Sequence, residues 1–275
     1  MIKRKYTTVL TIAGSDSGGC AGIQADLKTF SALGVFGASV ITAVTAQNTQ
    51  EVRAIETMSS AIVREQAEAV LDDIPVDAVK TGMLPTPEII KTVASLIDRY
   101  NLKNVVVDPP MVATSGMRLT DTNIADAFRE YLFTRATLIT PNISEAETFS
   151  GIPLRTQSDF EKAAKIMLEQ GCRAVLIKGG HFQEEQSTDM LFGHQKGACA
   201  AFNQPYIQSN NLHGTGCTLS SAIAAYLALG EDLETAVRRA ATYTNAAIRS
   251  GREAVMGKGH GPVNHFFSPK KPHFT

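Results

Sequence analysis

A cysteine stands directly behind two glycines where a helix is predicted to begin, in the stretch HGTGCTLSSAIAAYLALG. Apolar residues recur at three- and four-residue spacing over 219–227, which predicts an amphipathic helix. The first turn of a helix has backbone N–H groups without intrahelical acceptors, and their dipoles favour a bound anion. Here these groups would belong to Gly216, Cys217 and Thr218. The stretch therefore predicts a phosphate site beside a thiol whose pKa the helix end should lower.

The same stretch leaves a simpler interpretation open. Gly214 and Gly216 would let a phosphate approach the backbone, but a Gly-x-Gly pair is also ordinary turn chemistry. Cys217 could equally be a small core residue, because free cysteine is among the most buried residue types. Familiar nucleotide motifs do not fit: a dinucleotide fingerprint needs a glycine where Leu219 stands, and no Gly-Lys-Ser/Thr loop is present. A phosphate bound here would belong to another fold.

The composition favours a globular protein that acts on small molecules. The chain has 275 residues, is 44% hydrophobic and carries a formal net charge of -1. No linker, repeat or basic patch divides it, so we expect one domain over 1–275 and no nucleic-acid partner. Its apolar runs are short of a membrane span, and the basic start MIKRKY leads into an alternating run without a signal core, so we expect a cytoplasmic protein without a membrane partner. Cys20, Cys172, Cys199 and Cys217 form no CxxC pair, which predicts free thiols.

Strand-like runs alternate with amphipathic runs along nearly the whole chain. The predicted strands are 8–14, 38–44, 77–83, 104–110, 136–142 and 174–180. The predicted helices are 22–34, 59–74, 87–100, 123–133, 144–151, 158–171, the one that follows HGTGC, and 232–251. This alternation predicts an α/β fold with a mainly parallel sheet covered by helices on both faces. Segment 189–208 instead predicts an antiparallel edge. Ligands should lie beyond the carboxyl ends of the strands, where several polar or glycine-rich clusters fall.

The joint order of these clusters is similar to that of a known family. The segments TIAGSDSGGCAGIQADLKTFSALG, SVITAVTAQNTQ, KTGML, VVDPPMVATSG, LITPNISEAE, KGGH, HGTGCTLSSAIAA and GKGHGPVNHFF resemble the hydroxymethylpyrimidine/phosphomethylpyrimidine kinases of the ribokinase-like superfamily, almost from end to end. The resemblance implies a three-layer α/β/α sandwich and an ATP- and Mg²⁺-dependent kinase that forms a homodimer.

The resemblance also implies roles for residues at the phosphoryl group and the nucleotide. Gly214, Thr215 and Gly216 would form the anion hole, and Cys217 stands where relatives outside this branch carry a catalytic aspartate. A thiol is tolerable there, since phosphoryl transfer needs alignment and charge neutralisation more than a strong base. Glu145 would hold the metal, and Asp108 could support the same ion through water or only cap the turn before Pro109. The implied ATP-binding residues are Asn142, Lys178, Asp189 and His213. From the residues alone, Asn142 and Glu145 also read as a helix start, Lys178 as solvated surface and His213 as a loop histidine.

The implied substrate-binding residues are Gly14, Ala21, Asp26, Gln47, Met83 and Pro110. The Gln47 amide suits an aminopyrimidine edge, because it can donate to a ring nitrogen and accept from an exocyclic amine. Asp26 could instead be only a first-turn acid of its helix. Two positions depart from the family pattern: Cys20 replaces a glycine, which could restrict its loop, and Pro110 replaces a valine and lacks an N–H.

The expected reactions are phosphorylation of 4-amino-5-hydroxymethyl-2-methylpyrimidine to its monophosphate and of that product to the diphosphate. Pyridoxine or pyridoxal is an alternative substrate, because it also carries a hydroxymethyl group on a planar ring. A non-catalytic pyrimidine-binding module is an alternative of another class. The joint presence of HGTGC and PNISE argues against it, since a sensor has no need of phosphoryl-transfer groups.

Overall fold

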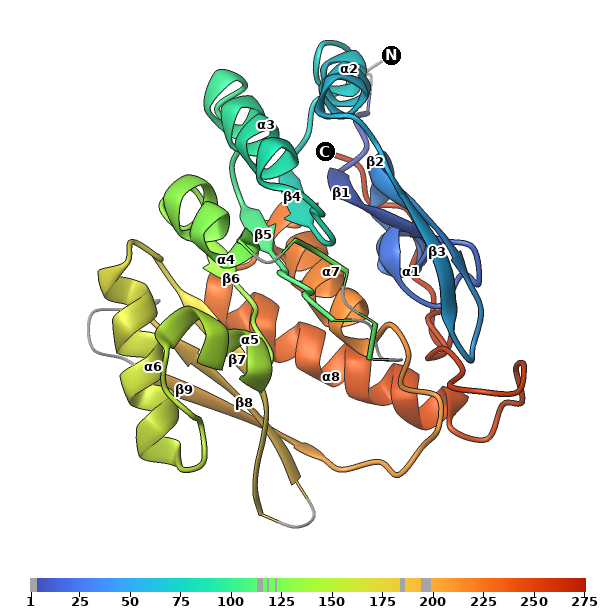
Figure 1. The fold of residues 1–275 in the computed structure, drawn as a ribbon. Coiled ribbons are helices and arrows are strands. Elements are labelled where there is room, and N and C mark those ends of the chain that lie inside the picture. Colours follow the sequence, from blue (N-terminus) through green and yellow to red (C-terminus); the bar gives the residue numbers. More distant parts are fainter. Residues whose placement is uncertain (1–3, 113–115, 118, 122, 184–185, 194–198) are drawn as a thin grey trace.

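The computed structural model describes residues 4–112, 116–117, 119–121, 123–183, 186–193 and 199–275, which form a sheet with helices on both faces (Figure 1). The sheet order is β3-β2-β1-β4-β5-β6-β7-β8-β9. The strands are β1 Thr8–Asp16, β2 Phe36–Gln47, β3 Val52–Thr57, β4 Ala78–Thr81, β5 Val105–Val107, β6 Leu138–Ile139, β7 Val175–Gln183, β8 Gln186–Phe192 and β9 Cys199–Pro205. The six strands from β2 to β7 in that order pair in parallel, whereas β3, β8 and β9 pair antiparallel.

The helices divide between the two faces of the sheet. They are α1 Gly22–Ala32, α2 Ser60–Leu71, α3 Pro87–Arg99, α4 Ile124–Ala127, the π-helical η1 Phe128–Leu132, α5 Ile143–Ser150, α6 Gln157–Glu169, α7 Thr215–Ala228 and α8 Leu233–Gly251. Helices α1, α7 and α8 pack together on one face, and α2, α3, α5 and α6 cover the other (Figure 1). The predicted three-layer α/β/α architecture is therefore confirmed.

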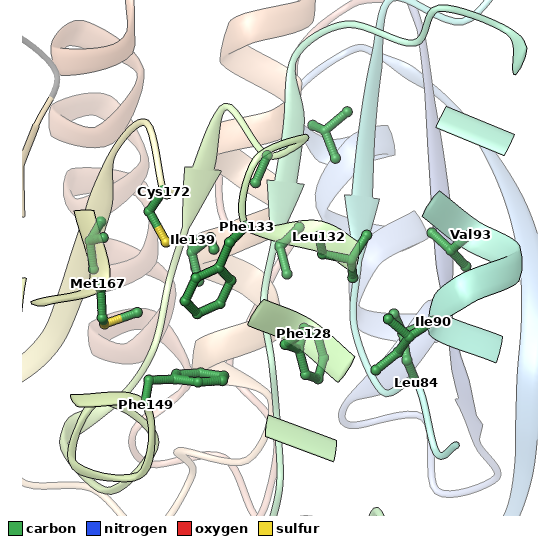
Figure 2. Packing of buried hydrophobic residues seen from close by; sticks show 14 of the residues in the cluster. Leu84, Ile90, Val93, Phe128, Leu132, Phe133, Ile139, Phe149, Met167 and Cys172 are labelled. Atoms are coloured by element: carbon green, nitrogen blue, oxygen red, sulfur yellow. The ribbon is translucent and has the colours of Figure 1, made fainter. Parts of the chain in front are cut away.

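The alternation of side chains along the strands builds a separate core on each face. Val105 and Val107 belong to the core that holds the aromatic cluster of Phe128, Phe133 and Phe149 (Figure 2), whereas Val106 belongs to the core under α7 and α8. Since successive strand side chains point to opposite faces, a continuous Val-Val-Val run indicates a strand buried on both sides. This strand ends just before Asp108 and thereby directs that residue to the rim of the sheet.

The structure corrects two element predictions. Strand β3 was not predicted, because five of its six residues are exposed or half-buried and the segment carries no apolar periodicity. The single helix predicted over 123–133 is a short α-turn that widens into η1. The antiparallel edge predicted at 189–208 is confirmed by β8 and β9, although 194–198 lie outside the described residues. Within the described chain, no helix has the length and hydropathy needed to cross a membrane.

Candidate active site

Two cavities open at the carboxyl-end rim of the sheet and share part of their walls. The smaller, of about 210 Å³, is bordered by the loop after β1, the ends of β2 and β4, and the start of α7. The larger, of about 410 Å³, lies between β8, the segment after β9, α7 and α8. Asn142, Lys178 and Gly216 line both cavities. A group carried between the two cavities would pass these three residues.

The start of α7 has the geometry of an anion site. Gly214 is the N-cap with φ of 82°, a left-handed conformation that favours glycine. A Cβ at this position would lie 2.0 Å from the carbonyl oxygen of Cys20, so the turn also packs tightly against the loop after β1. The backbone N–H groups of Thr215 and Thr218 donate to Leu212 and Gly214, respectively. The N–H groups of Thr215 and Thr218, both predicted to face an anion, are therefore already engaged, and the prediction now rests on those of Gly214, Gly216 and Cys217.

The pKa of Cys217 contradicts the sequence prediction. Burial raises the pKa of this thiol to about 11, with the charges of Asp26 and Asp108 adding to the rise. The positive charge of Lys80 and a hydrogen bond from the N–H of Gly22 act in the opposite direction but do not outweigh burial. The sequence places the thiol in the field of the helix end, which was therefore expected to lower its pKa. The sequence does not show how far the thiol is withdrawn from water.

A sealed ion pair lies behind Cys217. Lys80 Nζ contacts both Asp26 oxygens at 2.9 Å, and both side chains are completely buried. Thr11 and Ser221 also donate to Asp26, each at 2.6 Å. Asp26, predicted to bind substrate, is thus occupied by protein partners and does not line the smaller cavity. Lys80 does line it and was missed, because a lysine at a strand end normally reads as surface.

A second ion pair joins the two cavities. Lys178 Nζ lies 2.7 Å from Asp108 Oδ1, and Thr140 and Ser220 also donate to this carboxylate. Burial alone would raise the pKa of Asp108, but Lys178 and Lys80 hold it below its usual value. Burial opposes the charge of Lys178 as well, yet Asp108 and Glu145 raise its pKa. Both members of the pair are therefore charged at neutral pH.

Asn142 and Glu145 form a capping box at the start of α5. Asn142 Oδ1 accepts from the N–H of Glu145, and a Glu145 oxygen accepts from the N–H of Asn142 at 2.8 Å. The helix-start interpretation is therefore correct, and both residues also line the smaller cavity. Burial raises the pKa of Glu145 to about 7 and the charge of Asp108 adds to it, although Lys178 partly opposes the shift.

The remaining predicted substrate residues lie around the smaller cavity. Gly14, Ala21, Gln47, Met83 and Pro110 all line it. A Cβ on Gly14 would lie 3.1 Å from the sulfur of Met83, so a glycine lets this thioether approach the strand. Cys20 does not need a left-handed backbone, because in its loop Gly19 and Gly22 take the positive φ values. The departure from glycine at Cys20 is thus accommodated.

Two predicted ATP-binding residues differ in their placement. Asp189 accepts from the N–H of Gly179 at 2.9 Å and lines the larger cavity. His213 lines the smaller cavity instead, where its Nε2 lies 3.0 Å from the Nε2 of Gln47. The structure therefore moves His213 from the predicted nucleotide side to the side of Gln47.

The donor atoms at the junction suit a hard cation. Carboxylate and amide oxygens of Glu145, Asp108 and Asn142 are the kind that Mg²⁺ prefers, and a bound cation would favour the charged form of Glu145, whose pKa burial raises to about 7. Within the described residues, one other group of three metal-ligand types comes close, Asp16, Cys20 and His213, with atoms within 4.8 Å of one another. A thiol and an imidazole are not the oxygen ligands that Mg²⁺ prefers, so this group has the wrong chemistry for Mg²⁺.

The fold and the paired cavities define a small-molecule kinase of the ribokinase-like class. The family profile described as phosphomethylpyrimidine kinase matches residues 16–264. A hydroxymethylpyrimidine/phosphomethylpyrimidine kinase of Rhizobium meliloti is 47% identical over 94% of this chain and 96% of its own. The chain belongs to the phosphomethylpyrimidine kinase family, as its motifs predicted.

Other relatives widen the comparison. The thiamine biosynthesis bifunctional protein of Geobacter sulfurreducens is 49% identical over 95% of this chain, which spans 52% of that longer protein. A crystal structure of a phosphomethylpyrimidine kinase from Clostridium difficile is 45% identical with a TM-score of 0.77 and covers 88% of this chain and 99% of its own. A pyridoxal kinase from Staphylococcus aureus, in complex with pyridoxal, is 36% identical with a TM-score of 0.86 and covers 98% and 96%.

Proposed function

We propose that this protein transfers the γ-phosphoryl group of ATP to the hydroxymethyl group of 4-amino-5-hydroxymethyl-2-methylpyrimidine and then phosphorylates the monophosphate to the diphosphate. The observation that carries the proposal is the meeting of two cavities at Asn142, Lys178 and Gly216. The smaller cavity suits a ring with a polar edge at Gln47. The larger one suits a nucleotide, since its apolar lining includes Pro205, Ile207, Leu212, Leu219, Ala241 and Ile248.

Charge neutralisation at the junction is the main contribution we assign to the chain. The N–H groups of Gly216 and Cys217 and the ammonium of Lys178 would face the transferring phosphoryl group. Mg²⁺, held through Glu145 and Asp108, would supply further positive charge to the phosphates when bound. The acceptor oxygen forms the new bond to the γ-phosphorus as ADP leaves.

Cys217 aligns the acceptor hydroxyl as a neutral thiol, and the hydroxyl proton passes to an oxygen of the transferred phosphoryl group. With its pKa raised to about 11, the sulfur is a thiol at neutral pH and not a thiolate that could act as a base. A loose phosphoryl-transfer transition state needs little base assistance, so the proton leaves after the phosphorus–oxygen bond has begun to form. Cys217→Ala should lower kcat about 10- to 100-fold with the fold preserved, and kcat of the native protein should stay nearly flat from pH 7 to 9. A tenfold rise per pH unit would instead make a ground-state thiolate the base.

A product assay tests the proposed function. The protein is incubated with Mg²⁺-ATP and either the hydroxymethylpyrimidine or pyridoxine, and phosphorylated products are followed by phosphorus NMR. We expect mono- and then diphosphate from the pyrimidine. Pyridoxal kinase activity is the second candidate, favoured by the likeness to the Staphylococcus aureus pyridoxal kinase over nearly the whole chain. Pyridoxine phosphate as the only product would select it, and binding without turnover of either compound would select a non-catalytic module.

A further inference from the structure

Gln47 at the end of β2 is held at both ends of its side-chain amide. Its Nε2 lies 3.0 Å from His213 Nε2, and its Oε1 lies 3.2 Å from the hydroxyl of Thr45. All three residues line the smaller cavity, and the side chains of Thr45 and His213 are buried. These two contacts hold the amide in place beside the cavity, with one N–H and one oxygen lone pair left for a ligand.

This contact couples the orientation of the Gln47 amide to the position of the His213 ring hydrogen. With the amide nitrogen toward the ring, that nitrogen donates to His213 Nε2, which requires the ring hydrogen to be on Nδ1. The ring is neutral in this arrangement. Burial supports that state because it lowers the pKa of His213, and nearby His260 adds to the lowering while Asp16 opposes it.

The hydroxyl of Thr45 would permit a second arrangement. It has one hydrogen but two acceptors, Ser15 O at 3.1 Å and Gln47 Oε1 at 3.2 Å. If the hydroxyl donated to Ser15, its oxygen could accept from a reversed Gln47 amide. The reversed amide would then direct its oxygen at His213 Nε2, which would need a hydrogen there. Because Thr45 fits either orientation, the orientation of the Gln47 amide depends on which ring nitrogen of His213 carries the hydrogen.

We propose that His213 is a positioning residue that fixes the orientation of the Gln47 amide and thereby selects the ring edge that the acceptor cavity binds. The inference rests on the proposed function. An aminopyrimidine edge places a ring-nitrogen acceptor beside an amine donor, so a reversed amide would oppose donor to donor and acceptor to acceptor. A ring hydroxyl can donate or accept, so a pyridinol edge tolerates either orientation. His213 thus favours the aminopyrimidine without touching the transferred phosphoryl group.

A double-mutant cycle tests the inference. The dissociation constant of the hydroxymethylpyrimidine is measured by calorimetry at pH 8 without ATP for the native protein, Gln47→Ala, His213→Phe and the double variant. We expect about tenfold weaker binding for Gln47→Ala and about fivefold for His213→Phe, since each loses part of two hydrogen bonds. In the Gln47→Ala background His213→Phe should change binding less than about twofold, because its effect passes through the amide. Pyridoxine binding should change less than about twofold with His213→Phe alone.

A matched control and a second measurement complete the test. His260→Phe removes an exposed histidine from the same side of the molecule and should leave pyrimidine binding unchanged. Nitrogen-15 NMR of labelled histidine should show the His213 hydrogen on Nδ1. If the native protein binds the pyrimidine but the effects of the two substitutions on the binding free energy are additive, this inference is overturned and the proposed function stands. A hydrogen on Nε2 overturns it for any substrate, and a native protein that binds no pyrimidine overturns both.

Discussion

Two lysine–aspartate pairs lie under the active site, and their surroundings differ. Lys80 and Asp26 are sealed from solvent at 0% exposure each, and Thr11 and Ser221 complete the coordination of the carboxylate. Lys178 and Asp108 keep 14% and 4% of their side chains exposed; Lys178 faces both cavities and Asp108 faces the smaller one. Lys80 borders the smaller cavity, but its ammonium is held by both oxygens of Asp26, whereas Lys178 keeps exposed area with which it can contact a ligand. We infer that the first pair holds the site together and the second acts on the phosphates.

The largest expected effect is on the sealed pair. Asp26→Asn would leave the ammonium of Lys80 buried without a counter-charge, and removal of one member of a buried pair destabilises proteins by about 3–5 kcal/mol. Urea unfolding should show this loss as a lower midpoint. Asp108→Asn is the matched comparison and should lose clearly less stability, because Lys178 can reach solvent. Equal losses in the two variants would end the distinction between sealed and open pairs.

Next in size is the response of the open region to pH through Glu145. Its pKa rises from 4.5 to about 7 in the folded protein, so the folded state binds the proton more tightly than the unfolded chain. The contribution of Glu145 to the free energy of unfolding is therefore fully present below about pH 4.5. It is lost as the pH rises through 7, by up to about 3 kcal/mol.

Thermal unfolding over this pH range measures the slope attributed to Glu145. Glu145→Gln should flatten it, and millimolar Mg²⁺ should reduce it in the native protein by favouring the carboxylate. A slope that Mg²⁺ leaves unchanged would remove Glu145 from the proposed metal site.

Lys178→Met addresses the function of the open pair. Loss of a positive charge from the phosphates should lower kcat about 100-fold, equivalent to about 2.7 kcal/mol of transition-state stabilisation. The unfolding free energy should change less than it does for Asp26→Asn. Steady-state kinetics and urea unfolding provide the two measurements, and Lys165→Met, on an exposed lysine of α6, is the control. Normal turnover with reduced stability would make this pair structural, like the first.

The smallest effect sharpens the comparison within α7. Neighbouring Ser220 and Ser221 each donate to one of the two aspartates, at 3.1 and 2.6 Å. Ser221→Ala should lose about 1–2 kcal/mol, because a buried carboxylate loses a donor. Ser220→Ala should lose less, since this hydroxyl shares its one hydrogen with the carbonyls of Gly216 and Cys217. Chemical unfolding of the two variants side by side would detect a reversal of this order.

The architecture was predictable because hydrophobic periodicity is local, whereas charge pairing is not. The alternation of strands and helices follows from short windows of sequence, as the Val105–Val107 run shows. The partner of Lys80 is 54 residues away, so no window reveals that this lysine is buried. Strand β3 has no apolar pattern at all. Burial also decided the pKa of Cys217, and the contact between His213 and Gln47 spans 166 residues.

The walls shared by the two cavities constrain how this chain can change. Asn142, Lys178 and Gly216 line both cavities. A substitution at one of these residues that suits a new acceptor therefore also alters the place where the phosphate donor binds. Divergence toward other acceptors is therefore favoured at positions that border the smaller cavity alone, such as Gln47 and Met83. A designer of new acceptor specificity would keep the common wall fixed and vary only the far side of the smaller cavity.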